Sequence, residues 1–421
     1  MIDAGVLLLG LLAQSPLSDA NNAQSAVRFD QRGFIENSTA VYPQTAPNDS
    51  GRVVDDLLFR EEASYKFAPW FTVSGSFDAR TDSHRQTARD GVVDADDRSI
   101  QRPAFSVRRL SATIHRGKIT AEIGRQLIRW GKTDILNPTD RFAPKDYLSS
   151  VVDTDFLGVT AARVTYESGG DTVDLVWQPW FTPSRTPLLN QRWTALPPEA
   201  AGVSITPISI NDGGAHYPGG SQYGVRWNHI GSGYEYSLCF FDGYQNLPSF
   251  DALFTPATAS VALTRTYPDL RLYGGDAAVP LRWLTIKGEA AYFTSSTTGA
   301  EEYALYVIQL ERQVKEWSFV GGYAGSVVTR DAASPLQFAP DRGFAKSFVG
   351  RAGLTIDANR SLAIETAVRA EGSFVRFEYS QLFGQHWRAT GGIAWIRGDM
   401  TDFLGEYRRN SYGSLAIRYS F

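Results

Sequence analysis

A basic segment between residues 124 and 147 carries the side chains best suited to bind charged solutes. It reads GRQLIRWGKTDILNPTDRFAPKDY, and its candidate residues are Arg125, Arg129, Lys132, Asp134, Asp140 and Arg141. From residue 102 to residue 145 there are ten Lys or Arg and three Asp or Glu, whereas the whole chain has a net charge of −4. Cationic groups around a narrow aqueous passage lower the electrostatic barrier to anion entry. We therefore predict that this segment forms a pore constriction that favours anions.

Further charged side chains alternate with apolar residues in nearby segments and would extend this field if they face the same passage. These are Arg109, Glu122, Arg163 and Arg226. The alternative is that the arginines pair with neighbouring Asp and Glu, which would fix the segment in place without conferring selectivity. The two hypotheses are compatible, and the sequence leaves both open.

The sequence contains few residue patterns typical of catalytic or metal-binding sites. The five histidines and the single cysteine are scattered, with no pair of histidines four residues apart, so no zinc site is expected. There is no G-x-S-x-G element, so we expect no enzymatic activity and no cofactor. The net charge gives no reason to expect a nucleic-acid partner. An acidic stretch contains Asp90, Asp94, Asp96 and Asp97, which would suit calcium or cation bridging to lipopolysaccharide, or simply form a solvated loop.

Segments of about ten residues with alternating polarity recur along the chain, and helical periodicity is nearly absent. In TVDLVWQ, for example, Val173, Leu175 and Trp177 alternate with Asp174 and Gln178. This pattern places one side-chain type on each face of a strand. Charges on the second face of strand after strand suit a water-filled interior better than a packed core, where unpaired charge is costly.

Short and long connections between these segments alternate along the chain. The long ones lie at about 43–51, 81–103, 127–155, 181–220, 243–268, 295–301, 329–344 and 398–408. Outer-membrane barrels are built in this way, with tight periplasmic turns and longer outer loops. We therefore predict an all-β fold, a transmembrane antiparallel up-and-down β-barrel in the bacterial outer membrane. If the C-terminus is periplasmic, a strand must precede the first long connection, and residues 27–42 supply it. The total is then about 18 strands, with 16 as the alternative.

Two of the long connections are expected to shape the lumen. The first, about 127–155, mixes basic and apolar residues and is predicted to fold inward. The second, about 181–220, is rich in Pro, Gly and apolar residues and is predicted to act as a lid over the mouth. A surface loop packed on its neighbours is the alternative for the second connection. Residues 25–421 are then a single barrel.

The two ends of the chain also fit an exported barrel. Residues 1–24 contain the apolar run VLLLGLLA and are predicted to be a signal peptide, although the usual preceding basic residue is replaced by Asp3. The alternative is a disordered N-terminus. At the other end, SLAIRYSF finishes on Phe421 with its apolar residues on one face. We expect this closing strand to contact lipid and lipopolysaccharide, and Phe421 to be recognised by the barrel-assembly machinery.

One strand does not fit a simple alternation. In LLFREEASYKF any uninterrupted register turns either Glu61 or Glu62 toward lipid. A β-bulge near Arg60 would shift the pattern by one residue and repair this. Alternatively the glutamate lies near a membrane boundary, where charge is tolerated better.

The stretches GFIENSTA, GRQLIRWGKTDILNPTDRF and VDLVWQPWFTPSRTPLL resemble a broad group of uncharacterised porin-like bacterial outer-membrane barrels. The shared signature is GRQ-x₃-WG…NP-x-D followed by a V-W-x-P-x-F strand. The matching residues are Gly124, Arg125, Gln126, Trp130, Gly131, Asn137, Pro138, Asp140, Val176, Trp177, Pro179 and Phe181. The group is similar in style to alginate-export barrels, whose lumen is lined with arginine. The resemblance implies a porin-like passage through the barrel.

These observations favour a porin-like channel for passive diffusion of small polar or anionic solutes through a basic constriction. One alternative is a dedicated export or uptake conduit for a polyanionic polysaccharide or an amphipathic molecule. Another is a closed structural or adhesive barrel whose loops fill the lumen. The sequence names neither the solute nor the gating rule.

Overall fold

The computed structural model describes residues 28–91, 93, 97–195, 199–200, 203–204, 209–333 and 336–421. The predicted signal peptide and the acidic residues Asp94 and Asp96 lie outside these ranges. Among the described residues, no helix is both long and apolar enough to cross a membrane.

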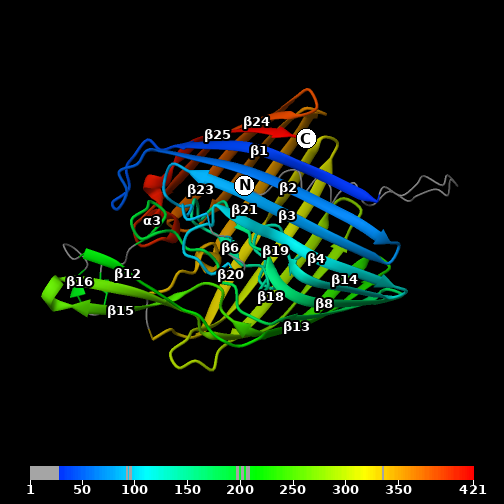
Figure 1. Ribbon diagram of the computed structural model, residues 1–421, viewed down its shortest axis with the longest axis horizontal. Coiled ribbons are helices and arrows are strands. Elements are labelled where there is room, and N and C mark those ends of the chain that lie inside the picture. The colour runs from blue at the N-terminus through cyan, green and yellow to red at the C-terminus, as the bar shows by residue number, and fades with distance from the viewer. Residues whose placement is uncertain are drawn as a thin grey trace.

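An 18-stranded antiparallel sheet closes on itself, which confirms the predicted barrel and strand number (Figure 1). Its strands, in chain order, are β1 (Phe29–Val41), β2 (Val53–Ala68), β3 (Phe71–Asp82), β4 (Phe105–Arg116), β5 (Ile119–Gln126), β8 (Val159–Ser168), β9 (Asp171–Gln178), β13 (Gln222–Gly231), β14 (Tyr234–Tyr244), β17 (Asp269–Pro280), β18 (Thr285–Thr294), β19 (Glu302–Val314), β20 (Trp317–Arg330), β21 (Ser347–Asp357), β22 (Arg360–Val368), β23 (Gly372–Phe383), β24 (Trp387–Gly398) and β25 (Tyr412–Ser420). Each strand pairs with the next, and β1 pairs with β25 from Phe34↔Ser420 to Val41↔Gly413 to close the barrel.

The connections at the two ends of the barrel differ in length, as the alternation of short and long connections in the sequence predicts. One end carries tight turns, two of which place Gly169 and Gly233 at φ values of 64° and 84°. Glycine adopts this left-handed backbone without a steric penalty. The other end carries the long connections. The outer wall between the ends is apolar and aromatic, with exposed residues such as Leu175, Trp177 and Ile417.

A β-bulge occurs on β4, whereas β2 has none at Arg60, the position that one of the two explanations for Glu61 required. β1 and β2 stay in uninterrupted register through Gly33↔Glu61, so the bulge alternative is wrong and the membrane-boundary alternative is left. Glu61 faces outward, where it accepts a hydrogen bond from Gln31 Nε2 (2.6 Å). Gly33, its partner on β1, also exchanges hydrogen bonds with Phe421, the last residue of the chain. Glu61 therefore lies at the level where the closing strand ends.

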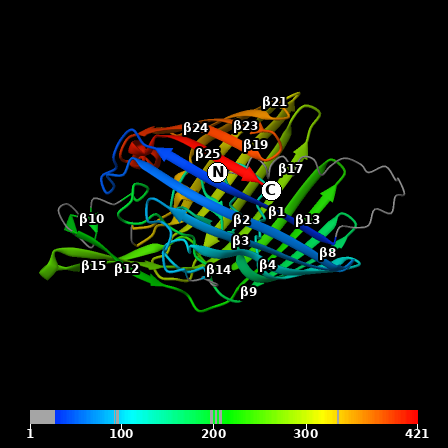
Figure 2. The ribbon, with the colours of Figure 1, turned by 45° about the horizontal axis from the view of Figure 1, so that its top comes forward.

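A small three-stranded sheet projects from the long-loop end of the barrel (Figures 1 and 2). It joins β12 (Ser209–His216), β15 (Ser249–Thr255) and β16 (Ser260–Thr266), with β15 and β16 connected through the short helix η1 (Pro256–Thr258). The remaining short elements are β6 (Lys145–Asp146), β7 (Asp155–Phe156), β10 (Glu199–Ala200), β11 (Val203–Ser204), α2 (Pro340–Gly343), α3 (Phe403–Glu406) and η2 (Arg408–Asn410). The described part of the 181–220 connection therefore divides into a buried segment and a segment that leaves the barrel. Residues 181–195 include many buried side chains, whereas β12 extends outward.

Candidate functional site

The connection between β5 and β8 lies inside the barrel and packs against one side of its wall. Trp130 and Phe142 meet edge to face with ring centroids 5.2 Å apart, and Phe142 also meets Phe241 of β14 at 4.9 Å. Gly224 of β13 leaves the space that these rings fill, since a Cβ there would collide with both of them. Trp130 Nε1 donates to Asp174 of β9 (3.0 Å). Apolar packing thus holds the connection against the β9–β18 wall.

A single carboxylate on β18 anchors the middle of this connection. Glu289 is 2% exposed and accepts hydrogen bonds from the backbone N–H groups of Lys132 (2.9 Å), Thr133 (3.1 Å) and Thr139 (2.9 Å). The hydroxyls of Thr133 and Thr139 donate to it as well, at 2.9 and 2.8 Å. Hydrogen bonds to an ionised acceptor are stronger than those between neutral groups. Glu289 therefore fixes residues 132–139 to the wall.

Most of the charges predicted to line the constriction also serve to pin the connection. Lys132 pairs with Glu235 of β14, and Arg141 pairs with Asp341 of α2 (3.3 Å). Asp134 accepts from Gln309 Nε2 (2.6 Å), and Asp140 pairs with Arg129 (3.2 Å). These charges are paired with the wall, with another long connection or within the inward connection itself.

Arg125 belongs to a second cluster, which lies between the inward connection and the β2–β5 wall. Gly124 has a φ of 123° and no room for a Cβ beside the Leu110 carbonyl, and this backbone lets Arg125 turn inward at the end of β5. We call the cluster the arginine cage and define it as Arg60, Arg80, Arg102, Arg108, Arg125 and Arg185. It draws on β2, β3, β4, β5 and two long connections.

Aspartates are interleaved with the arginines of the cage. Asp97 pairs with both Arg125 and Arg185. Asp146 lies 2.7 Å from Arg102 and 3.3 Å from Arg185. On the wall, Arg60 pairs with Asp78 (2.7 Å) and Arg80 with Asp56 (2.8 Å). Asp97 of the acidic stretch is therefore buried among arginines and not solvated.

Two adjoining cavities lie at the cage. The smaller has a volume of about 40 Å³ and is lined by the whole cage together with Asp155, Phe156 and others. The larger has about 190 Å³ and extends between the inward connection and the β1–β3 wall as far as Arg418 of β25. Both are lined by Arg60, Arg80, Arg102, Asp146 and Asp155. The cage therefore borders the space that the inward connection leaves unfilled.

Two further cationic side chains lie against the aromatic ring of Phe156, which lines the smaller cavity. The guanidinium of Arg129 lies 4.2 Å from the ring centroid and the ammonium of Lys145 lies 5.2 Å from it. Burial lowers the pKa of Lys145, and the nearby Asp140 offsets part of this effect. Burial raises the pKa of Asp155, but the charges of Arg108 and other arginines outweigh it and hold that pKa below its usual range.

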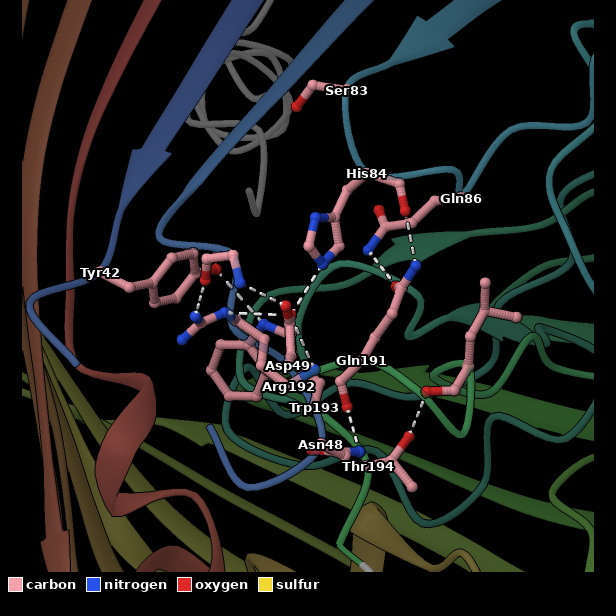
Figure 3. Close-up of polar contacts among 12 residues, drawn as sticks. Tyr42, Asn48, Asp49, Ser83, His84, Gln86, Gln191, Arg192, Trp193 and Thr194 are labelled. Atoms are coloured by element: carbon pink, nitrogen blue, oxygen red, sulfur yellow. Dashed lines mark hydrogen bonds and ion pairs between the residues drawn. The ribbon is translucent and has the colours of Figure 1, made fainter. Parts of the chain in front are cut away.

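Polar contacts among several long connections form a junction at the mouth of the barrel (Figure 3). We define the mouth junction as Tyr42, Asn48, Asp49, His84, Gln86, Gln191, Arg192 and Asn410. Asp49 lies 2.7 Å from His84 Nε2 and accepts from the Arg192 backbone N–H (3.2 Å). The Arg192 guanidinium lies 3.7 Å from the centre of the Tyr42 ring.

Neighbouring side chains extend the junction to further connections. Gln191 donates to the His84 carbonyl (2.7 Å) and accepts from Gln86 Nε2 (2.9 Å). Asn410, in the connection between β24 and β25, donates to the Arg192 carbonyl (2.8 Å). Residues 189–194 thus tie the first, second and last long connections together.

The predicted wall residues form pairs along the barrel interior. Arg109 donates to Glu122 (2.9 Å), Arg163 pairs with Asp174 (2.7 Å) and Arg226 pairs with Asp276 (2.8 Å). None of these four predicted residues lines either cavity at the cage among the described residues.

Sequence reasoning missed Arg60, Arg80, Arg102, Arg108 and Arg185. Arg102 and Arg108 fall within the basic block, but nothing in the sequence brings Arg102 to Asp146, 44 residues away along the chain, or Arg108 to the cavity that Asp155 also lines. Arg108 turns inward through the β4 bulge, where it is the extra residue between Val107↔Phe77 and Arg109↔Ser76. A simple alternation would have placed it outside.

Several solved structures share this architecture. OccAB4 of Acinetobacter baumannii matches with a TM-score of 0.55 at 10% identity, covering 95% of this chain and 100% of that chain. A BenF-like porin from Pseudomonas fluorescens Pf-5 matches at 0.53 and 10% identity, covering 94% and 98%. OccK3 of Pseudomonas aeruginosa matches at 0.52 and 10% identity, covering 93% and 96%. No protein-family model and no curated protein sequence matches the chain. The likeness establishes the fold, that of an outer-membrane porin barrel.

Proposed function

We propose that the protein is a porin-like channel that lets small polar and anionic solutes diffuse across the outer membrane. The observation that carries this proposal is the arginine cage beside the two cavities of about 40 and 190 Å³. The inward connection packs its aromatic rings against the β9–β18 wall and also lines the cage through Asp146, Asp155 and Phe156. Solutes are therefore directed along the β1–β4 wall, past six arginines.

The charge balance at the cage favours anions. The excess of arginine is confined to the smaller cavity, where six arginines face the carboxylates Asp78, Asp97, Asp146 and Asp155, whereas four arginines and five carboxylates line the larger cavity. Paired charges in a low-dielectric wall still produce a net field in the lumen. The excess of positive charge lowers the barrier for anions more than for cations.

Single-channel recording in planar bilayers tests this proposal through the reversal potential under a KCl gradient. We expect steady current with a reversal potential on the chloride side. Arg108→Ala, which removes a cage arginine, should shift that potential toward zero. Arg351→Ala is the matched control, because Arg351 pairs with Glu365 on the far wall and lines neither cavity. Cation selectivity of the intact protein would contradict the proposal.

The mouth junction favours a second candidate, a conduit that stays closed until a substrate or partner moves the outer connections. Its contacts join residues 48–49, 84–86, 189–194 and 410, which lie far apart in the sequence. Such a conduit would show no current until the junction is broken. Recording from Arg192→Ala distinguishes the candidates, since only a closed conduit would gain current from silence.

A further inference from the structure

The outer wall of the barrel carries an apolar groove on strands β18 to β22, close to the short-turn end. The groove has a volume of about 490 Å³, and at its centre Gly321 of β20 is directly paired with Gly350 of β21. Leu310, Phe319 and Ile364 border this glycine pair, and all three are exposed on the outer face. The outer face of a membrane-spanning barrel contacts lipid, so the groove opens toward the hydrocarbon of the membrane.

The paired glycines leave space that no described side chain of the protein fills. A Cβ at Gly321 would lie 3.9 Å from its nearest neighbour, the Val349 carbonyl oxygen. A Cβ at Gly350 would lie 3.4 Å from Thr366 Cγ2. The space beside Gly224 differs, because aromatic rings of the inward connection occupy it. The groove can therefore accept an apolar chain from outside the protein.

One cation lines this groove on its lipid-facing side. Arg312 of β19 is exposed, and its guanidinium lies 6.0 Å from the centre of the Trp283 ring, which also lines the groove. The two other charged residues of the lining, Glu311 and Arg351, form ion pairs on the inner face of the wall. Arg312 is therefore the charge that the groove presents to the membrane.

Two more cations lie in the adjoining turns, Arg282 between β17 and β18 and Lys315 between β19 and β20. Among the described residues, none of Arg282, Arg312 and Lys315 forms an ion pair. Glu316 is the only carboxylate in the two turns, both of which the structure describes in full. Three cations against one carboxylate leave an excess of two positive charges, and basic groups at a membrane surface are attracted to anionic lipid.

We propose that this groove binds one glycerophospholipid of the periplasmic leaflet, with an acyl chain along Gly321 and Gly350 and the phosphate at Arg312. The short turns of such a barrel are periplasmic, so Arg312 lies near the head groups of that leaflet. Trp283 has the amphipathic character that suits the same level of the membrane. The positive excess favours an anionic head group, such as phosphatidylglycerol, over a zwitterionic one, such as phosphatidylethanolamine. The site is on the outer surface and does not depend on the proposed channel function.

A second arginine of the same barrel offers an internal comparison. Arg116, the last residue of β4, also lies at the short-turn end against a tryptophan, with its guanidinium 5.0 Å from the centre of the Trp70 ring. It lines neither the outer groove nor the cavities at the cage. A general attraction between boundary cations and lipid would involve both arginines alike, whereas a lipid held in the groove depends on Arg312.

Native mass spectrometry of the full-length protein, with phosphatidylglycerol added to the detergent solution, tests the proposal by counting the lipids that each barrel retains. We expect one tightly retained phosphatidylglycerol per barrel and weaker retention of phosphatidylethanolamine. Arg312→Ala should weaken binding about fivefold, the effect of one basic group near a membrane surface, and Arg312→Lys should recover most of it. Gly321→Leu should abolish tight binding, because its side chain would occupy the groove. Arg116→Ala should bind lipid as the unmodified protein does.

Four results would overturn the proposal. Equal losses in Arg312→Ala and Arg116→Ala would show a general attraction instead of a site. Unchanged retention in Gly321→Leu would show that no acyl chain lies in the groove. Preference for lipid A over phosphatidylglycerol would contradict the periplasmic leaflet. Barrel dimers or trimers that Gly321→Leu dissociates would identify a second copy of the chain as the occupant. Heat-dependent migration in gel electrophoresis verifies that each variant is folded before it is compared.

Discussion

Glu289 should control the position of the inward connection, so its removal is the most informative single substitution. The Glu289→Ala variant leaves three backbone N–H donors, those of Lys132, Thr133 and Thr139, without their acceptor. An orphaned buried donor costs about 1–3 kcal/mol, which gives roughly 3–9 kcal/mol for the three. Water in the lumen can solvate the freed groups, so we expect the lower end of this range.

Hydrogen exchange measured by mass spectrometry reports directly on these donors. A loss of about 3 kcal/mol corresponds to roughly a hundredfold faster exchange of the affected amides. Residues 132–139 should therefore lose protection, while residues near Trp130 and Phe142 should keep it because their rings stay packed. The released segment should also raise the single-channel conductance.

Two further variants make the result specific. Glu289→Gln keeps one acceptor oxygen and should give an intermediate loss of protection. Glu122→Ala is the matched control, since the Glu122 side chain pairs with Arg109 on the wall and, among the described residues, makes no hydrogen bond to residues 132–139. Unchanged exchange at residues 132–139 in Glu289→Ala would refute the anchoring role.

Other substitutions test separate parts of the structure. Trp130→Ala should lower the free energy of unfolding by about 3–5 kcal/mol in denaturant titrations, because it empties a buried aromatic site. Gly224→Leu should destabilise the fold as well, since a side chain there would displace Trp130 and Phe142. Arg192→Ala should loosen the mouth junction and increase the exchange of amides in residues 189–194. Glu61→Leu should raise the thermal unfolding temperature slightly by removing a charge from the outer face.

The barrel could be predicted from the sequence because its determinants are local. Alternation along a strand, as in Val173 to Gln178, needs only the two-residue repeat of side chains. The alternation of short and long connections then requires an even number of strands, and counting the connections favours 18 over 16. The inward packing of residues 127–155 was also suggested by local composition, since Trp130 and Phe142 are poorly suited to an exposed loop.

The site was less predictable because it depends on which charges meet across the lumen. Arg129, Lys132 and Arg141 have the same local character as Arg108, yet among the described residues all three have an ion partner and Arg108 has none. Partner choice is decided by contacts between residues such as Arg141 and Asp341, 200 positions apart. The bulge that turns Arg108 inward likewise has no sequence signal that we could identify.

Single-channel conductance of the intact protein, compared with a variant lacking residues 127–155, tests the central claim most directly. If the inward connection narrows an open channel and confines solutes to the arginine cage, the intact protein conducts with an anion bias. The deletion should then give a larger conductance with weaker selectivity. Two folded barrels with the same conductance and selectivity, or two that pass no current, would contradict the account.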